Sequence, residues 1–274
     1  MQNLTEANLS DVVIAAMAGA KDERFKIIMT SLVKHLHAFI REANLTESEW
    51  LAGIQFLTAV GQKCDDKRQE FILLSDTLGA TTMKDIINNR KPPGVTEYTI
   101  LGPFHRGDAP EFPLSANLAG DLPGDPVVMR GRVLARNGSP IPNAALDVWQ
   151  SDAEGFYDLQ MPDMKGTALR GIFHADADGN YIFHTIKPSF YPIPYDGPVG
   201  QMLTAMGRHP YRPAHVHFII SAEGYQSVTT ELFVSGDPYL DSDAVFGVRE
   251  SLVVPFAQND SGFTVDYDFV LEPA

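Results

Sequence analysis

Apolar residues in the first ninety positions recur at helical spacing. Between residues 25 and 40 they fall three or four positions apart, which places them on one stripe of a helix. This stripe contains Phe25, Ile28, Met29, Leu32, Leu36, Phe39 and Ile40. Thr46 and Glu49 then have the form of a capping box, in which each side chain accepts a hydrogen bond from the other residue's backbone amide. Further helices are predicted over residues 68–78 and 82–89.

The sequence Lys-Pro-Pro-Gly at residues 91–94 ends the helical pattern, because two prolines cannot lie in a helix interior. We therefore predict a helical linker and dimerisation domain over residues 1–94 and a second domain over residues 95–274. The helices carry more apolar surface than one small helical layer hides. This surplus predicts a homodimer that forms through the helical region.

From residue 95 onward the pattern changes to short strands separated by turns. Strands are predicted over residues 127–134, 144–150, 171–174 and 181–184, with an Asn-Gly turn at 137–138. Residues 263–271 alternate apolar and polar side chains, as in a strand that is buried on one face. With no helix expected among these strands, the pattern predicts an antiparallel β-sandwich and a chain that is mainly β.

Charge and cysteine content narrow the possible partners and location. The 21 basic and 35 acidic residues give a net charge of −14, which makes nucleic acid and anionic membrane poor partners. The single cysteine, Cys64, excludes a disulfide framework and fits a reducing compartment. Glu6 and Asp11 stand where a signal peptide needs basic residues, and the apolar run at 12–18 is too short to span a bilayer. These features predict a cytoplasmic protein.

Two histidines near the C-terminal third have the spacing of metal ligands. Residues 212–220 are predicted to form a strand after Pro213, and side chains alternate faces along a strand. His215 and His217 therefore project from the same face, which is half of a metal site. A pair of buried, hydrogen-bonded core histidines is the alternative at this point.

Four spaced motifs resemble the intradiol ring-cleavage dioxygenases. They are Asp147-Val148-Trp149-Gln150 with Gly155-Phe156-Tyr157, then Pro188-Ser189-Phe190-Tyr191, Gly207-Arg208-His209-Pro210, and Arg212-Pro213-Ala214-His215-Val216-His217. Their order and separations are similar to those of the family across roughly residues 95–255. The resemblance implies one non-haem Fe(III) per subunit, bound by Tyr157, Tyr191, His215 and His217.

The chemistry of these residue types agrees with the implied metal. Phenolate is a hard anionic donor that suits ferric iron, and a trivalent cation stabilises the ionised form of tyrosine. Thiolates for zinc are absent, and we expect no carboxylate near the two histidines of the kind that a ferrous site requires. In the implied reaction an aromatic vicinal diol binds the iron, Tyr191 leaves the metal and acts as general base, and Arg212 stabilises negative charge on the ring.

The resemblance also implies a substrate pocket. Its members would be Leu73, Asp76, Ile100, Gly102, Pro103, Phe104, Ile193, Pro194 and Arg212. The run Tyr191-Pro192-Ile193-Pro194 is similar to the branch of the family that cleaves hydroxyquinol (1,2,4-trihydroxybenzene) to 3-hydroxy-cis,cis-muconate, the tautomer of maleylacetate. Asp76 is a candidate acceptor for the third hydroxyl group, or else a solvent-facing carboxylate. Glu231 stands where catechol-cleaving relatives carry glutamine.

Two other interpretations stay open at the level of sequence. In the first, the ring-cleavage chemistry is the same but the substrate is catechol or a chlorinated catechol. In the second, the chain is not an enzyme, because residues 131–157 also resemble transthyretin-like sandwich modules, which are binding or structural domains without catalytic activity. Family members also bury a lipid-like molecule between their N-terminal helices, so the resemblance implies a possible lipid ligand.

Overall fold

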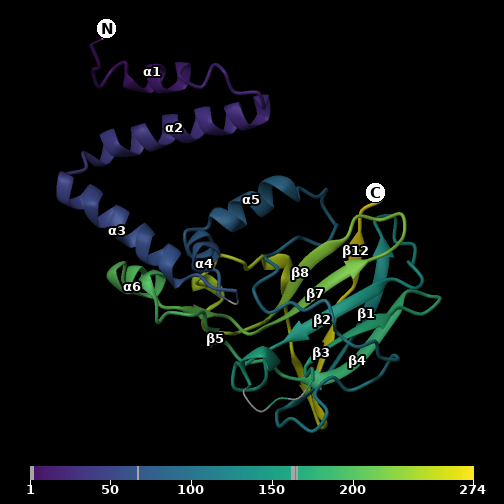
Figure 1. Cartoon of the computed structure of the whole chain (residues 1–274). Helices are drawn as coiled ribbons and strands as arrows, with labels where there is room; N and C mark the ends of the chain where they lie inside the picture. Colours follow the sequence, from purple (N-terminus) through teal and green to yellow (C-terminus); the bar gives the residue numbers. More distant parts are fainter. Residues whose placement is uncertain (1–2, 67, 162–163, 165) are drawn as a thin grey trace. The chain divides into compact units, whose positions relative to one another are not determined.

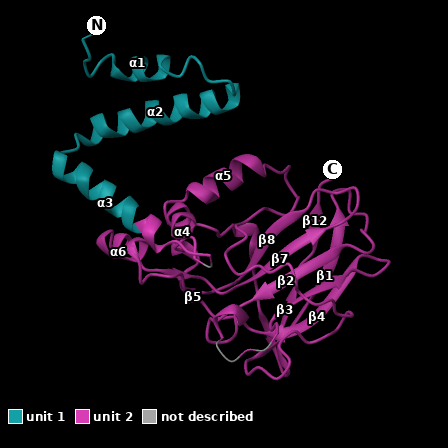
Figure 2. Cartoon of the chain, in the orientation of Figure 1, with its two compact units in different colours: residues 1–59 teal, residues 60–274 magenta. Residues whose placement is uncertain are grey.

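The computed structural model describes residues 3–66, 68–161, 164 and 166–274. The chain forms two compact units, Met1–Ala59 and Val60–Ala274 (Figure 2). They divide within a helix rather than at residue 94, where the sequence predicts the domain boundary. The later helices belong to the second unit because their buried side chains contact it, as when the Thr82 hydroxyl donates to the carbonyl of Val245 at 3.0 Å.

The first unit is helical, as the apolar stripe predicts. It contains α1 (Leu9–Ala15), α2 (Glu23–Ala43) and most of α3 (Glu47–Lys63). The predicted capping box at the start of α3 is confirmed, since Thr46 N donates to Glu49 Oε2 at 2.9 Å and Glu49 N donates to Thr46 Oγ1 at 3.3 Å. No residue of α2 is buried, so its apolar stripe is open in this chain.

The described part of the second unit also includes helices α4 (Glu70–Thr77), α5 (Ala80–Asn88) and α6 (Pro198–Ala205) (Figure 1). α4 and α5 confirm the two short helices predicted before the strands. α6 contradicts the expectation that no helix interrupts the strands. Pro198 is compatible with the first turn of a helix, where its missing amide is not needed, but within a proline-rich run it conceals the helix start. None of the described helices combines the length and the apolar character needed to cross a membrane.

Two five-stranded sheets pack face to face and confirm the predicted sandwich. The first sheet contains β1 (Pro126–Ala135), β4 (Asn180–Ile186), β10 (Ala257–Asn259), β11 (Gly262–Asp266) and β12 (Phe269–Leu271). The second contains β2 (Ala145–Gln150), β3 (Arg170–His174), β7 (His215–Ser221), β8 (Val228–Val234) and β9 (Val253–Val254). β1 pairs in parallel with β11 and β12, and β8 pairs in parallel with β9, so the sheets are mixed rather than wholly antiparallel.

The strand predicted over residues 263–271 is broken into β11 and β12. At the break, Tyr267 N donates to the Arg130 carbonyl at 3.0 Å, and Arg132 N donates to Asp268 Oδ1 at 2.8 Å. Gly131 of β1 permits this close approach, since a Cβ there would lie 1.8 Å from the Tyr267 carbonyl oxygen.

The main core lies between the two sheets and sets the direction of the histidines. Val216, Phe218 and Ile220 of β7 point into this core and are fully buried. Alternation along the strand therefore places His215 and His217 on the opposite face, as predicted. The two-stranded ribbon of β5 (Tyr191–Pro192) and β6 (Tyr211–Arg212) pairs Tyr191 with Arg212.

Candidate metal centre and active site

His217 lies at the middle of a row of side chains from three adjacent strands. In the sheet register, Trp149 of β2 and Glu231 of β8 stand directly across from it on either side. The indole of Trp149 stacks on the imidazole with ring centroids 4.7 Å apart and an interplanar angle of 4°. The neighbouring strands therefore fix both the position and the plane of this ring.

The imidazole of His215 has one nitrogen committed to the backbone. Its Nδ1 lies 2.6 Å from the Pro213 carbonyl, and since that carbonyl can only accept, Nδ1 carries the proton. Nε2 is then a lone-pair donor, the tautomer that a metal ligand needs.

Three other atoms that could bind a metal lie close to His215 Nε2. His217 Nε2 lies 3.1 Å away, and the phenol oxygens of Tyr157 and Tyr191 each lie 3.4 Å away. One lone pair cannot accept three hydrogen bonds, whereas ligand atoms that share a metal at ~2.0–2.2 Å lie roughly 3 Å from one another. The structure thus brings together all four residues that the sequence nominates as ligands, in an arrangement that fits a metal ion.

Burial keeps the four groups neutral in the absence of a cation. Burial raises the pKa of Tyr157 well above its usual value, with a further contribution from Tyr191, and burial also raises the pKa of Tyr191. Burial lowers the pKa of His215 to about 4 and that of His217 well below its usual value. The imidazoles are therefore unprotonated near neutral pH, and ionisation of the phenols requires a strong positive charge beside them.

Tyr157 is held in place by an ion pair that sequence reasoning missed. The next residue, Asp158, accepts from Arg170 Nε at 2.7 Å, and both side chains are buried. Arg170 Nη1 also donates to the carbonyl of Phe104 at 3.1 Å, and the Phe104 ring stacks on Tyr157 with centroids 4.3 Å apart. No local pattern reveals this pair, because it joins a short 3-10 helix (Asp158–Gln160) to the first residue of β3.

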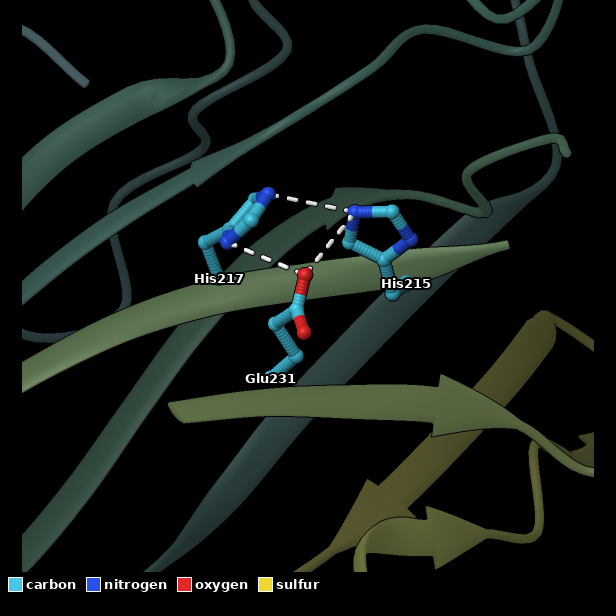
Figure 3. A group of neighbouring side chains, drawn as sticks. All are labelled: His215, His217 and Glu231. Atoms are coloured by element: carbon cyan, nitrogen blue, oxygen red, sulfur yellow. Dashed lines mark hydrogen bonds and ion pairs between the residues drawn. The ribbon is translucent and has the colours of Figure 1, made fainter. Parts of the chain in front are cut away.

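The expectation of no carboxylate near the histidines is wrong. Glu231 Oε1 lies 3.4 Å from His215 Nε2 and 3.5 Å from His217 Nδ1 (Figure 3). His215, His217 and Glu231 are also the group among the described residues that lies close enough to share an ion. The antiparallel pairing of β7 with β8 is the cause, since its register sets Glu231 directly opposite His217.

Arg212 lies between two buried carboxylates. Its guanidinium donates to both oxygens of Glu231, at 2.6 and 3.2 Å, and to both oxygens of Asp243, at 3.1 and 3.2 Å. Burial favours the neutral form of Glu231, but the Arg212 charge and its hydrogen bonds outweigh burial and hold the pKa of Glu231 below its usual value. The sequence did not nominate Asp243, because only tertiary folding brings it to Arg212.

Apolar members of the predicted substrate pocket form one cluster. Ile100 and Ile193 are buried together with Leu203, Ala244 and Val245, and Leu73 packs against them. The structure therefore brings α4, α6 and the loops at residues 100 and 193 to a common apolar wall.

The other predicted pocket residues differ in how close they lie to the metal centre and in how exposed they are. Gly102 has a φ of 72°, and a Cβ there would lie 3.4 Å from His217 Cε1, so its backbone runs against the histidine. Asp76 is half-buried, and burial raises the pKa of its carboxyl although a hydrogen bond from Thr81 and the Arg212 charge oppose this shift. Pro103 and Pro194 are exposed to solvent, and their assignment to the pocket stays a prediction.

Comparison with known proteins places this site in a family. Residues 22–96 match a family model described as "Catechol dioxygenase N terminus", and residues 102–273 match one described as "Dioxygenase", which covers more than half of the chain. The chain belongs to the intradiol ring-cleavage dioxygenases. Membership assigns it intradiol ring cleavage and favours an enzyme over the non-catalytic sandwich module.

Three relatives of this dioxygenase cover nearly the whole chain. The 6-chlorohydroxyquinol 1,2-dioxygenase of Cupriavidus pinatubonensis is 50% identical over 100% of this chain and 99% of that protein. The crystal structure of hydroxyquinol 1,2-dioxygenase from Pseudomonas putida DLL-E4 has a TM-score of 0.94 and 47% identity, and covers 98% of this chain and 99% of that one. The catechol 1,2-dioxygenase of Candida albicans is 38% identical over 90% of this chain and 86% of that protein.

Proposed function

We propose that this chain is an Fe(III)-dependent hydroxyquinol 1,2-dioxygenase with one iron per subunit. The observation that carries the proposal is the convergence of Tyr157, Tyr191 and His217 on His215 Nε2 within 3.1–3.4 Å. Identities of 50% and 47% to enzymes named for hydroxyquinols, against 38% to one named for catechol, support the choice of substrate.

The donor set favours ferric over ferrous iron. A ferrous site would combine His215 and His217 with the Glu231 carboxylate. Both oxygens of that carboxylate are already bonded to Arg212. The phenol oxygens of Tyr157 and Tyr191, by contrast, lie 3.4 Å from their neighbours, longer than the ~2.7–2.8 Å of an ordinary O–H hydrogen bond, so they remain available to a metal. Fe(III) at this point would withdraw electron density from a bound aromatic diol and make its ring reactive toward O2.

Residues of the chain accept the proton of a substrate hydroxyl and stabilise the negative charge that develops on the ring. Tyr191, paired with Arg212 across the β5–β6 ribbon and ionised to phenolate beside a bound ferric ion, would accept a proton from a substrate hydroxyl at that oxygen. Arg212, buried and fixed by Glu231 and Asp243, stabilises negative charge on the ring. Ile100 and Ile193 exclude water from the ring. The bond between the two adjacent hydroxyl-bearing carbons breaks, both atoms of one O2 enter the product, and the product is 3-hydroxy-cis,cis-muconate, the tautomer of maleylacetate.

We propose that Asp76 recognises the third hydroxyl group of the substrate by accepting a hydrogen bond from it. It lies on α4 next to the apolar wall, is partly withdrawn from water, and interacts electrostatically with Arg212. A buried acceptor left without its hydroxyl is costly, so such a residue discriminates against a ring that lacks the group.

The helical unit is the part of the chain that we propose forms a homodimer. Large apolar side chains of α2 and α3 are exposed, among them Phe25, Leu32, Phe39 and Trp50. An apolar surface of this kind is covered in a stable soluble protein, and pairing with a second copy covers it. The lipid-like molecule implied by the family resemblance would lie among these same side chains.

Visible absorption of the iron-loaded protein tests the proposed function. Tyrosinate bound to Fe(III) gives a charge-transfer band, and anaerobic hydroxyquinol should shift it. Turnover of hydroxyquinol with O2 should then exceed that of catechol and of chlorocatechol. A protein that stays colourless after ferric loading would contradict the ligand set, and faster turnover of catechol or chlorocatechol would contradict the substrate.

A further inference from the structure

A network of charged side chains links the start of α4 to the proline-rich segment that carries Tyr191. The Arg68 guanidinium lies 2.7 Å from Glu70 Oε2 on α4 and 2.5 Å from Asp196 Oδ1 on the proline-rich segment. Lys63 Nζ adds a third contact, 3.1 Å from Asp196 Oδ2. Arg68 thus bridges two carboxylates that are more than a hundred residues apart in the sequence, beside the wall that α4 and α6 form (Figure 1).

Glu70 also fixes the beginning of α6. Its side chain is 0% exposed, and its Oε1 accepts a hydrogen bond from the amide of Val199 at 3.2 Å. A carboxylate at this end of a helix is favoured by the helix dipole. Gly197 makes the approach possible, since a Cβ there would lie 2.6 Å from Glu70 Oε1 and 2.8 Å from Arg68 Nη2. Arg68 therefore holds Asp196 and Glu70 holds Val199, and the side chains of Arg68 and Glu70 are bonded to each other.

The segment between these anchors and the metal centre is short and stiff. Prolines at 192, 194 and 198 fix the backbone φ angle at three of its positions. Ile193 is buried in the apolar wall, and its amide donates to the Pro210 carbonyl at 2.9 Å. Fixing Asp196 therefore restricts Ile193 and, beyond it, Tyr191.

We propose that Arg68, Glu70 and Asp196 are positioning residues that hold this segment in its substrate-binding conformation. This inference rests on the proposed function, because the segment contributes to the site only if the aromatic ring lies against Ile193. The three side chains bond to each other and to α6, not to the four metal-donor residues. Loosening them should therefore weaken substrate binding more than it slows the chemistry.

Asp196→Asn is the variant that tests the proposal. Asp196 is 64% exposed, so the substitution removes the charge without leaving a cavity or a buried unpaired group. We expect KM for hydroxyquinol to rise by about threefold to tenfold with kcat changed by less than about twofold, the scale of a partly screened ion pair. Asp196→Glu, which keeps the charge, should restore KM. High salt should raise KM of the wild-type enzyme but not of Asp196→Asn, because salt screens such pairs.

Hydrogen exchange tests the positioning role of Asp196 independently of the proposed enzyme activity. Amides of residues 191–200 should exchange faster in Asp196→Asn than in the wild type, with no substrate present. Asp266→Asn is the matched control, since it removes a similar but distant pair with Arg130 at 2.6 Å. If exchange and KM of Asp196→Asn equal those of Asp266→Asn, or if exchange rises while KM stays unchanged, the proposal is wrong. If no variant and no wild-type sample cleaves hydroxyquinol, the proposed function fails, and the exchange rates still show whether the network holds the segment.

Discussion

Glu231 links Arg212 to the two histidines of the site. It contacts both histidines and Arg212, and its buried carboxylate shares Arg212 with Asp243. Arg212 therefore carries one positive charge between two negative ones. From its position across from His217 in the sheet, Glu231 can orient both Arg212 and His217.

Glu231→Gln should reduce kcat/KM by roughly tenfold to hundredfold, the usual cost of altering a group that orients metal ligands. The amide keeps the size and one acceptor oxygen but leaves the Arg212 charge less balanced. Iron content should stay near that of the wild type, while the charge-transfer band shifts. Steady-state kinetics and the visible spectrum check this prediction, and Glu250→Gln, at an exposed glutamate, is the control. Kinetics equal to the control would contradict it.

Asp76→Ala should abolish much of the preference for a third hydroxyl. A hydrogen bond to a charged group stabilises by about 1.5–3 kcal/mol, so kcat/KM for hydroxyquinol should fall by roughly tenfold to a hundredfold. Catechol has no such hydroxyl, so its kcat/KM should change little and serves as the internal control. Equal losses on the two substrates would show that Asp76 supports the structure of the pocket instead.

At the scale of elements, the site depends on pairings that join distant segments. β5 and β6 contain two residues each, yet their register sets Tyr191 beside Arg212. β7 and β8 set Glu231 beside His217, and Arg68 ties α4 to the segment that follows β5. Each element is short, so long-range contacts rather than intrinsic propensity hold it in place.

The pairing of Asp196 should make a pH-dependent contribution to stability. Hydrogen bonds from Arg68 and then Lys63 lower the pKa of Asp196 from 3.8 to about 2. A depressed carboxyl pKa stabilises the folded state above the unfolded pKa, and this stabilisation is lost as pH falls through the folded pKa. The difference in unfolding free energy between the wild type and Asp196→Asn should thus be constant near neutral pH and shrink between about pH 4 and about pH 2. Urea unfolding at a series of pH values measures it, and a difference that widens on acidification would contradict the assignment.

At the scale of the whole molecule, the two compact units carry different tasks. All four candidate metal ligands, Arg212 and the apolar wall belong to residues 60–274. Residues 1–59 contain none of them and instead expose a long apolar stripe. The division fits an enzyme whose catalytic unit is complete in one chain and whose helical unit serves association.

Leu32→Glu should convert the proposed dimer to a monomer. Leu32 is 54% exposed on α2, and a glutamate there would place a charge in the middle of the apolar stripe. Light scattering coupled to size-exclusion chromatography gives the mass, and Ser31→Glu adds the same charge at the neighbouring exposed position as a control. A wild-type chain that elutes as a monomer would remove the basis of the prediction.

Local patterns in the sequence determined the helices before residue 95, most strands and the common face of His215 and His217. Periodicity of 3.6 and 2 reports which face of an element is apolar, so it found α2 and the direction of the histidines, and the Thr46–Glu49 motif marked the start of α3. The resemblance of four spaced motifs to the intradiol family then implied that Tyr157 and Tyr191 belong to the same ligand set. These properties depend on neighbours along the chain, which the sequence displays directly.

Tertiary structure alone decided the partners of those ligands. Glu231, Asp243, Arg170 and the Arg68 network reach their contacts through sheet register and loop packing, and the parallel pairing of β1 with β11 and β12 arises in the same way. A charged residue in a sequence does not reveal whether it will be buried or what will neutralise it. That outcome is fixed only when distant segments pack and remove water from between them, since burial makes each pairing obligatory.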